Sequence, residues 1–469
     1  MKIHLVAICG TGMGSLAGLL KTAGHDVRGS DKAFYPPMSE RLQAWGIPAL
    51  QGFDAKHIDP DTDMVIVGNA CRKDNPEAIA AQEKGLIIKS FPQALSELFI
   101  SQKRSVVIAG THGKTTTSSL LSFLLVEAQR DPSFLVGGIL QNYGKSFRLG
   151  KGPEFIVEGD EYDSAFFDKR PKFLHYQPNI AVLTSVEFDH ADIYDDMHAY
   201  RSAYRSFVDL LPRDGLLVAC IDDHEVSNLL PGANCQVIKY GLTDEADWQA
   251  QAMVPSRDGV VFELVVDKKP AGKVRIPLGG DHNVANTLAT LVVANQLGLA
   301  PPESAALLAG FSGVARRMQV RGISSGVTVI DDFAHHPTEV RSTVQAVRNS
   351  YPDANLVAVF EPRTNTSRRK FFQDEYPDSF GGADRVVIVP PFNSSQIPEA
   401  DLFDSAKLAD DLVKRGQAAV CLTAVDQVVK DLTKSVPAGG VILVMSNGAF
   451  DNIHEKLLSG LKEREGTRK

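Results

Sequence analysis

The segment Gly110-Thr-His-Gly-Lys-Thr-Thr-Thr117 combines two glycines, a lysine and several hydroxyl side chains. An apolar run precedes it at residues 105–109 and a leucine-rich stretch follows at residues 118–125, which predicts a strand, a turn and a helix. In such a turn the amides face nucleotide phosphates, Lys114 reaches the β- and γ-phosphates, and the Thr115 hydroxyl ligates Mg²⁺. The residues expected to bind ATP here are Gly110, Thr111, His112, Gly113, Lys114, Thr115 and Thr116.

Carboxylates and a histidine follow two later apolar runs. Residues 155–158 lead into Glu158-Gly-Asp160-Glu161, and residues 180–184 lead towards Asp189-His190. A carboxylate at the end of a strand beside the phosphate turn commonly holds Mg²⁺, so Glu158 is the expected ligand. A neutral His190 could complete a second metal site. The alternatives are a solvated acidic loop for the first segment and a surface turn for the second.

A basic pair, Arg316-Arg317, precedes the acidic pair Asp331-Asp332. The arginines stand where the second and third predicted domains join. An arginine at a hinge can reach a transferring phosphate when the domains close, and Arg317 is the candidate. Plain surface charge explains the pair equally well.

A second glycine-rich turn stands near the N-terminus, at Gly10-Thr-Gly-Met-Gly14. It follows the apolar run of residues 3–8 and precedes Asp31 by about twenty residues, as in dinucleotide-binding folds. Position 15 is serine, so the match to that fingerprint is incomplete and the nature of the ligand stays open. A phosphate-bearing substrate is expected to contact Gly10, Thr11, Gly12, Met13, Gly14 and Asp31.

These sites require three α/β domains to position them. Residues 1–100 predict a Rossmann-like unit in which residues 10–14 form a turn and residues 16–22 a helix. Residues 101–313 predict a central P-loop domain, in which a helix begins near residue 281 with Asp281 or Asn283 as its N-cap. Residues 314–469 predict a second Rossmann-like unit, with strands at 327–330, 356–360, 385–389 and 441–445.

The composition excludes several classes of protein. The chain has 469 residues and a net charge of −8, which disfavours a general nucleic-acid binder. Its five cysteines form no C-x-x-C pair, so reduced thiols and a cytoplasmic location are expected. Neither a membrane span nor a signal peptide is visible, so no membrane partner is expected.

These motifs, in this order, resemble those of the Mur ligase family, the ATP-dependent enzymes of bacterial cell-wall precursors. The resemblance spans the whole chain and includes the two glycine-rich turns, residues 282–286 and residues 331–339. It implies that residues 10–14 hold a UDP diphosphate, that Asn286 contacts adenine, and that Asp331 or Asp332 contacts the ribose. It also implies that the third domain binds a peptide, with Arg363, Ser446 and Asn447 at its strand ends.

Four stretches are similar to one branch of this family. They are residues 160–170, 172–176, 187–193 and 445–449. That branch joins the tripeptide L-alanyl-γ-D-glutamyl-meso-diaminopimelate to UDP-N-acetylmuramate in cell-wall recycling, through an acyl phosphate. The alternative is the branch that adds L-alanine to UDP-N-acetylmuramate during biosynthesis.

One position departs from several family members, which carry a carbamylated lysine where this chain has Tyr204. Since tyrosine cannot be carbamylated, the full coordination of a second metal ion stays open.

Two interpretations of the function outside these branches remain. A folylpolyglutamate-type ligase would lack the N-terminal unit, and a non-catalytic nucleotide sensor should have lost Lys114, Thr115 or Glu158.

Overall fold

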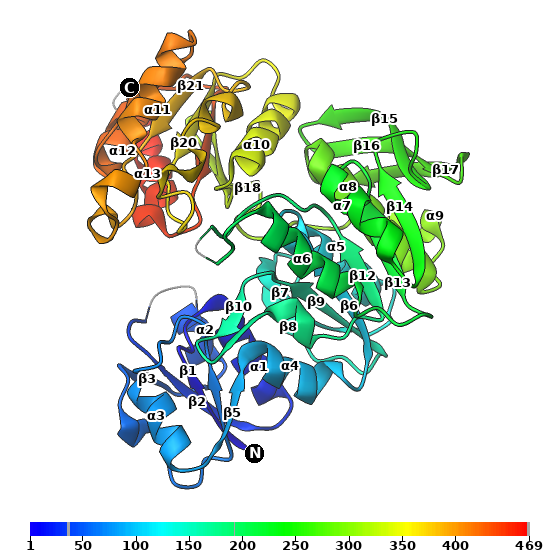
Figure 1. Ribbon diagram of the computed structural model, residues 1–469. Coiled ribbons are helices and arrows are strands. Elements are labelled where there is room, and N and C mark those ends of the chain that lie inside the picture. The colour runs from blue at the N-terminus through cyan, green and yellow to red at the C-terminus, as the bar shows by residue number, and fades with distance from the viewer. Residues whose placement is uncertain (35–37, 192, 467–469) are drawn as a thin grey trace.

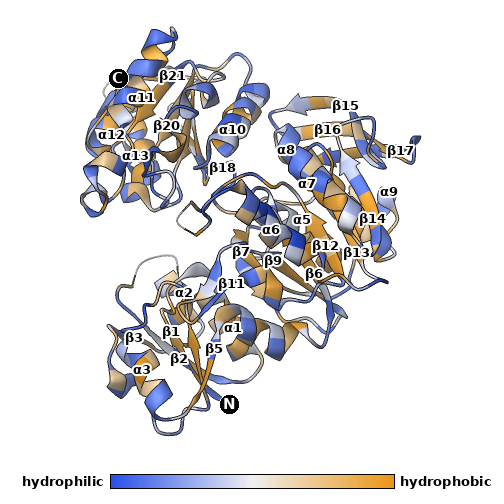
Figure 2. Cartoon of the chain, viewed as in Figure 1, coloured by the Kyte–Doolittle hydropathy of each residue, from blue (hydrophilic) through white to orange (hydrophobic). Residues whose placement is uncertain are grey.

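The computed structural model describes residues 1–34, 38–191 and 193–466. Its strands form three large sheets, one in each of three domains that follow one another along the chain (Figure 1). Apolar residues concentrate in the strands at the centre of each domain, as Figure 2 shows. The three-domain α/β fold expected from the sequence is confirmed. No helix in the described part of the chain is long and apolar enough to cross a membrane.

The N-terminal domain is a parallel five-stranded sheet in the order β3-β2-β1-β4-β5. The strand order reverses at β1, and ligands of such sheets bind beyond the carboxyl end of the strand at that point. The strands are β1 (Lys2–Val6), β2 (Asp26–Asp31), β3 (Ala49–Gln51), β4 (Met64–Val67) and β5 (Ile87–Ser90). The helices are α1 (Thr11–Thr22), α2 (Met38–Ala44), α3 (Pro76–Glu83) and α4 (Phe91–Leu95).

Helix α1 begins earlier than the sequence suggested. Residues 11–14 lie in its first turn, so the expected turn over residues 10–14 is wrong except at Gly10, the N-cap. Close packing explains the glycines within the helix. A Cβ atom on Gly14 would lie 2.2 Å from the Met38 sulfur, so no larger residue fits there.

The central domain has a ten-stranded sheet in the order β17-β16-β15-β14-β13-β12-β6-β9-β7-β8. The strands from β15 to β7 in this order pair in parallel, and antiparallel strands close both ends. Its strands are β6 (Arg104–Ala109), β7 (Ser133–Leu140), β8 (Lys145–Arg148), β9 (Glu154–Gly159), β12 (Ile180–Leu183), β13 (Leu216–Cys220), β14 (Gln236–Gly241), β15 (Trp248–Ser256), β16 (Gly259–Val266) and β17 (Lys269–Ile276). A separate hairpin joins β10 (Asp163–Ala165) to β11 (Asp168–Pro171).

Helices cover both faces of this sheet. They are α5 (Lys114–Glu127), α6 (Met197–Val208), α7 (His224–Leu229), α8 (Asp281–Gln296) and α9 (Pro301–Leu308). The expected N-cap of α8 is wrong, because Gly280 occupies that position with φ +93° and no side chain caps the helix. Asn283 instead lies inside the helix, where its amide donates to the carbonyl of Gly279 at 2.7 Å.

The C-terminal domain has six strands in the order β18-β19-β23-β20-β21-β22, parallel except for β18. The strands are β18 (Gln319–Ser324), β19 (Val327–Asp332), β20 (Leu356–Phe360), β21 (Arg385–Ile388), β22 (Ala418–Cys421) and β23 (Val441–Met445). Helices α10 (Pro337–Ser350) and α11 (Ser405–Lys414) pack with one apolar cluster. Helices α12 (Val425–Ser435) and α13 (Ile453–Gly466) pack with the other.

The N-terminal and central domains share one apolar core. Helix α1 lies against β7 and β8, and a Cβ atom on Gly18 would come within 2.3 Å of the Phe147 ring. The Ser15 hydroxyl lies 2.7 Å from that of Ser146, and the rings of Trp45 and Phe147 meet edge to face at 5.1 Å. This interface leaves little room for the two domains to move apart.

Candidate active site between the central and C-terminal domains

Glycines shape the turn between β6 and α5. Gly110 and Gly113 adopt φ angles of +135° and +83°, which side-chain-bearing residues rarely adopt. A Cβ atom on Gly110 would lie 2.1 Å from the Thr184 hydroxyl, and one on Gly113 would lie 2.5 Å from the Asn286 amide oxygen. Both positions therefore require glycine for backbone conformation and for space.

Lys114 is the first residue of α5, and its ammonium group is held within the turn. It donates to Glu161 Oε2 at 2.9 Å and to the carbonyl oxygens of Gly110 and Thr111. Burial opposes the charge, but Glu161 and Asp160 raise the pKa of Lys114 overall. The lysine is therefore a stable cation that must leave Glu161 to reach a phosphate.

Thr115 and Glu158 meet as the sequence suggested. The Thr115 hydroxyl donates to Glu158 Oε2 at 3.0 Å, and the Ser118 hydroxyl donates to Oε1 at 3.1 Å. Burial, and next the nearby charge of Asp160, raise the pKa of the Glu158 carboxyl. A buried carboxylate beside a hydroxyl and a second carboxylate is a set of oxygen donors that suits a hard cation such as Mg²⁺.

His190 adopts a positive φ of 55° and directs Nε2 to Glu161 Oε1 at 3.1 Å. Burial opposes protonation, but the bond to Glu161 raises the pKa of His190 to about 9. The neutral imidazole expected from the sequence is therefore not the form that this arrangement favours, and a metal ion at Nε2 has to displace a proton. The stretch of residues 187–193 includes Asp192, which lies outside the described residues.

Tyr204, at the position of the family lysine, is buried near the phosphate turn. Its hydroxyl lies 3.5 Å from that of Tyr200, which in turn lies 3.0 Å from the Thr111 hydroxyl. The tyrosine pair therefore supports the turn through hydrogen bonds, a role that needs no metal ion.

A cavity of about 330 Å³ lies between the central and C-terminal domains. Seven of the residues singled out in the sequence line it: His112, Gly113, Thr115, Thr116, Asn286, Arg317 and Asp332. Lys114, Glu158, His190 and Asp331 are not part of this lining. Its other walls include Asp222, Tyr240 and Phe311, which none of the sequence motifs contains.

The two acids at the end of β19 face opposite ways, because successive strand residues alternate between faces. Asp332 lines the cavity and accepts hydrogen bonds from the amides of Met318 and Ala334 at 2.7 and 2.8 Å. Asp331 instead lies 3.3 Å from both Arg321 Nη1 and His454 Nε2. The geometry thus separates two residues between which the sequence could not choose.

The guanidinium groups of Arg316 and Arg317 both lie over the Phe333 ring, at 5.2 and 5.0 Å, but of the two only Arg317 lines the cavity. Arg316 turns to the loop after β23 and donates to the carbonyl oxygens of Ser446 and Gly448. Arg317 is thus the one placed towards a nucleotide.

The N-terminal turn is closed by Asp31, whose carboxylate accepts from the amides of Cys9 and Lys32 at 2.9 and 2.7 Å.

In the C-terminal domain Arg363 stacks on the Phe392 ring at 3.6 Å. The Ser446 hydroxyl donates to Glu361 Oε2 at 2.5 Å, and Asn447 Oδ1 is buried without a partner. These groups stand at the carboxyl ends of β20 and β23.

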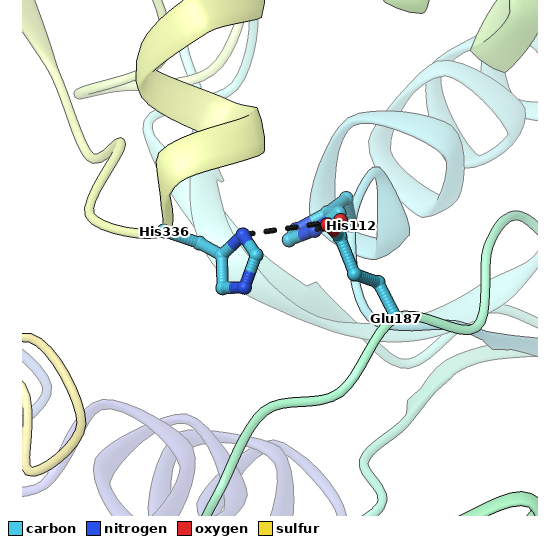
Figure 3. A group of neighbouring side chains, drawn as sticks. All are labelled: His112, Glu187 and His336. Atoms are coloured by element: carbon cyan, nitrogen blue, oxygen red, sulfur yellow. Dashed lines mark hydrogen bonds and ion pairs between the residues drawn. The ribbon is translucent and has the colours of Figure 1, made fainter. Parts of the chain in front are cut away.

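A cluster that the sequence did not assign surrounds His112 (Figure 3). His112 Nε2 lies 2.8 Å from Glu187 Oε2, and Nδ1 lies 3.2 Å from Glu339 Oε1. Burial opposes its charge, but the two glutamates raise the pKa of His112 to about 9. Two features of the sequence could have indicated this cluster. Glu187 follows a predicted strand, and Glu339 follows the pair His335-His336.

A P-loop domain placed between two other α/β domains, with an interdomain cavity beside the phosphate turn, defines a multidomain enzyme acting on a nucleotide. Three family models match consecutive parts of the chain. They are the Mur ligase family catalytic domain at residues 2–103, the Mur ligase middle domain at 108–294, and the glutamate ligase domain of Mur ligases at 316–448. The chain belongs to the Mur ligase family and is therefore a ligase that forms an amide bond.

Full-length relatives carry two names. The chain is 38% identical over 465 residues to the UDP-N-acetylmuramate–L-alanyl-γ-D-glutamyl-meso-2,6-diaminoheptandioate ligase of Escherichia coli K12, covering 99% of each chain. It is 35% identical over 459 residues to the UDP-N-acetylmuramate–L-alanine ligase of Desulfatibacillum aliphaticivorans, covering 98% of each.

The solved structures that resemble this chain also include both kinds of ligase. A murein peptide ligase from Psychrobacter arcticus is 33% identical with a TM-score of 0.75, and the match covers 98% of this chain and 99% of that one. A UDP-N-acetylmuramate–alanine ligase from Thermotoga maritima is 25% identical with a TM-score of 0.82, and the match covers all of both chains.

Proposed function

We propose that this ligase joins L-alanyl-γ-D-glutamyl-meso-diaminopimelate to UDP-N-acetylmuramate, with hydrolysis of ATP to ADP and phosphate. The observation that carries the acceptor is the full-length identity of 38% to a relative with this name. The ATP requirement is supported by the turn from Gly110 to Thr117, which has the glycines, lysine and hydroxyls of a phosphate site.

In this proposal the phosphate turn and its neighbours bind the triphosphate. Thr115 and Glu158 would hold Mg²⁺, and His190 would hold a second ion after losing its proton. When bound, Mg²⁺ supplies positive charge that offsets the phosphate oxygens. Lys114 leaves Glu161 to contact the β- and γ-phosphates, and Arg317 contacts the transferred group from the C-terminal side of the cavity.

The reaction then has two steps. The lactyl carboxylate of UDP-N-acetylmuramate attacks the γ-phosphorus, the bond to the β-phosphate oxygen breaks, and an acyl phosphate and ADP form. The amine of the tripeptide attacks the acyl carbon, loses a proton, and expels phosphate as the amide forms. The cavity between the domains protects the acyl phosphate from water.

The remaining contacts follow the division of the chain into residues 1–100, 101–313 and 314–469, which the three family matches support. Residues 10–14 and Asp31 contact the UDP portion, and Asn286 contacts adenine. Asp332, which faces the cavity, is the better candidate for the ribose than Asp331. The C-terminal domain binds the peptide, and the reaction takes place in the cytoplasm, where ATP is available.

The competing proposal is an L-alanine ligase. It is favoured by the TM-score of 0.82 to the Thermotoga enzyme, which exceeds the 0.75 to the murein peptide ligase. A score over three domains depends on how the domains are placed relative to one another as well as on their folds. Sequence identity does not depend on domain placement, and it is higher for the tripeptide ligase (38%) than for the L-alanine ligase (35%), so we give it more weight.

The deciding measurement compares kcat/KM for the tripeptide and for L-alanine at fixed ATP and UDP-N-acetylmuramate. We expect the tripeptide to be favoured by at least roughly 100-fold, because polar groups built for its carboxylates stay unpaired with L-alanine. The Lys114→Ala variant is the inactive control and should lose about 10²–10³ in rate. Equal or higher efficiency with L-alanine would identify the biosynthetic activity.

A further inference from the structure

Three side chains from three separate segments meet beside the phosphate turn. His112 lies between β6 and α5, Glu187 follows β12, and His336 is the N-cap of α10 in the C-terminal domain. One ligand atom from each lies within 4.8 Å of the others. Figure 3 shows the three side chains, with the His336 ring facing the Glu187 carboxylate beside His112.

The spacing of these atoms suits a tetrahedral ion. Bonds from zinc to histidine nitrogen or carboxylate oxygen measure about 2.1 Å, so two ligand atoms on one tetrahedral ion lie about 3.4 Å apart. Glu187 Oε2 lies 2.8 Å from His112 Nε2 and 3.8 Å from His336 Nδ1. The third separation, between the two histidine nitrogens, is at most 4.8 Å, so the side chains must rotate to bring all three separations to this value.

The groups behind the ligands are arranged as in protein metal sites, where a ligating histidine donates its other ring nitrogen to a carboxylate. His112 Nδ1 lies 3.2 Å from Glu339 Oε1. The second oxygen of Glu187 accepts a hydrogen bond of 2.7 Å from the Thr338 hydroxyl. These partners fix the orientation of two of the three ligands.

His336 supplies the third donor in a suitable state. Its side chain is 2% exposed, and its Nε2 atom has no hydrogen-bond partner. Burial, and next the charge of His112, lower the pKa of His336 to about 4, so it is a neutral imidazole near pH 7. Its Nδ1 atom, the one nearest Glu187, accepts the N-cap hydrogen bond of α10 from the Thr338 amide at 3.3 Å, so an ion at Nδ1 replaces that bond.

This cluster shares no residue with the expected Mg²⁺ ligands Thr115, Glu158 and His190. Its donors also differ in proportion. Thr115 and Glu158 offer Mg²⁺ oxygen atoms and His190 offers one nitrogen, whereas two imidazoles and one carboxylate favour zinc, cobalt or nickel. The family relationship alone therefore does not account for it.

We propose that His112, Glu187 and His336 form a binding site for Zn²⁺ or a similar divalent transition-metal ion. The ion takes the Nε2 position of His112 that now contacts Glu187, while Nδ1 keeps its contact with Glu339. It joins the phosphate turn to the first turn of α10 in this arrangement of the two domains. His112 and Glu187 also line the nucleotide cavity, so the ion would lie at its wall. The site does not depend on which acceptor the enzyme uses.

Cobalt provides a direct test, because tetrahedral Co²⁺ absorbs visible light far more strongly than octahedral Co²⁺. Full-length protein is treated with a chelator, desalted and titrated with Co²⁺ in the presence of excess Mg²⁺. We expect one equivalent to produce the absorption, and Zn²⁺ to abolish it. Glu187→Gln and His336→Gln should each weaken Co²⁺ binding at least tenfold, because each removes a ligand.

Two control variants separate this site from other histidines. His224→Gln removes a side chain that is 84% exposed, and His190→Gln removes the candidate magnesium ligand. Both should keep the Co²⁺ absorption. Glu339→Gln, which leaves all three ligands in place, should reduce affinity by roughly 10–100-fold. The Glu339→Gln variant still tests the proposal if circular dichroism shows that His336→Gln does not fold.

Three results would overturn the proposal. They are no tetrahedral absorption in the wild-type protein, unchanged affinity in folded Glu187→Gln and Glu339→Gln, or loss of the signal in His190→Gln. The last would place the ion at the expected magnesium site.

Discussion

Glu158 accepts hydrogen bonds from Thr115, Ser118 and the amide of Gly137, and these donors hold both of its oxygens. A Cβ atom on Gly137 would lie 2.9 Å from Glu158 Oε2, so the glycine leaves room for the carboxylate to approach the backbone. The carboxylate is thus fixed beside the Thr115 hydroxyl before any ligand arrives.

Glu158→Gln keeps this shape and removes the charge that a hard cation prefers. We expect the Mg²⁺ concentration for half-maximal activity to rise at least roughly tenfold, with a smaller change in nucleotide affinity. Activity is measured across a Mg²⁺ titration, and nucleotide binding by calorimetry. A titration curve that matches the wild type would transfer the role to Asp160 or Glu161.

At the scale of elements, apolar runs between polar turns predicted most strands. The expected ranges 356–360 and 441–445 coincide with β20 and β23, because both strands are buried on both faces. Strand β18 was not predicted, since only one of its edges is paired and its residues are largely polar or exposed. The early start of α1 was missed because its glycines serve packing, not a turn.

Prediction of the active site from the sequence has the same limit. Lys114, Thr115 and Glu158 could be placed together because the carboxyl ends of neighbouring parallel strands meet at one edge of the sheet. The contact of His112 with Glu339 could not, because it depends on where the C-terminal domain lies. Pairing across a domain boundary leaves no periodic trace in the sequence.

Helix α3 is anchored to the N-terminal sheet by a buried carboxylate, Glu77. Its oxygens lie 2.7 Å from His57 Nδ1 and 3.1 Å from His4 Nε2, and the Ser30 hydroxyl donates to it as well. Burial raises the pKa of Glu77, but the bonds from His4 and Ser30 outweigh this and lower it overall. The stability that Glu77 contributes is therefore complete above about pH 4.5 and is lost as the pH falls through the lower pKa of the folded state.

Glu77→Gln should lower the free energy of unfolding at pH 7 by roughly 1–3 kcal/mol, because a buried hydrogen-bonded charge is removed. Urea unfolding at several pH values measures this, with exposed Glu83→Gln of the same helix as the control. The difference between Glu77→Gln and wild type should shrink below about pH 4.5. A difference that grows on acidification would contradict this assignment.

Across the whole molecule, the two domain boundaries differ in kind. The N-terminal and central domains share an apolar core, whereas the central and C-terminal domains meet through polar contacts. Thr366 donates to Asp189 at 2.9 Å, and His112 contacts Glu339. Polar contacts can exchange for ligands and water, so the second boundary is the one that can move.

We therefore expect the C-terminal domain to close on the central domain when both substrates bind. Small-angle scattering should give a smaller radius of gyration with a non-hydrolysable ATP analogue plus UDP-N-acetylmuramate than for the free protein. UDP-N-acetylmuramate alone, which is expected near the rigid boundary, should change the radius less. An unchanged radius with both ligands at saturation would show that closure is not needed.

The close contact of Gly18 with Phe147 also governs how this chain can be recombined with its relatives. A chimera that takes its first domain from one parent and its second from another must match a helix without a side chain at position 18 to an aromatic ring. The later junction has a close approach of its own, since a Cβ atom on Gly280 would lie 2.7 Å from that of Ala346 in α10. The apolar clusters of these two domains are separate, however, whereas one cluster spans the first junction. Substrate range should therefore be easier to transplant through the C-terminal third of the chain, with residues 1–313 inherited as one piece.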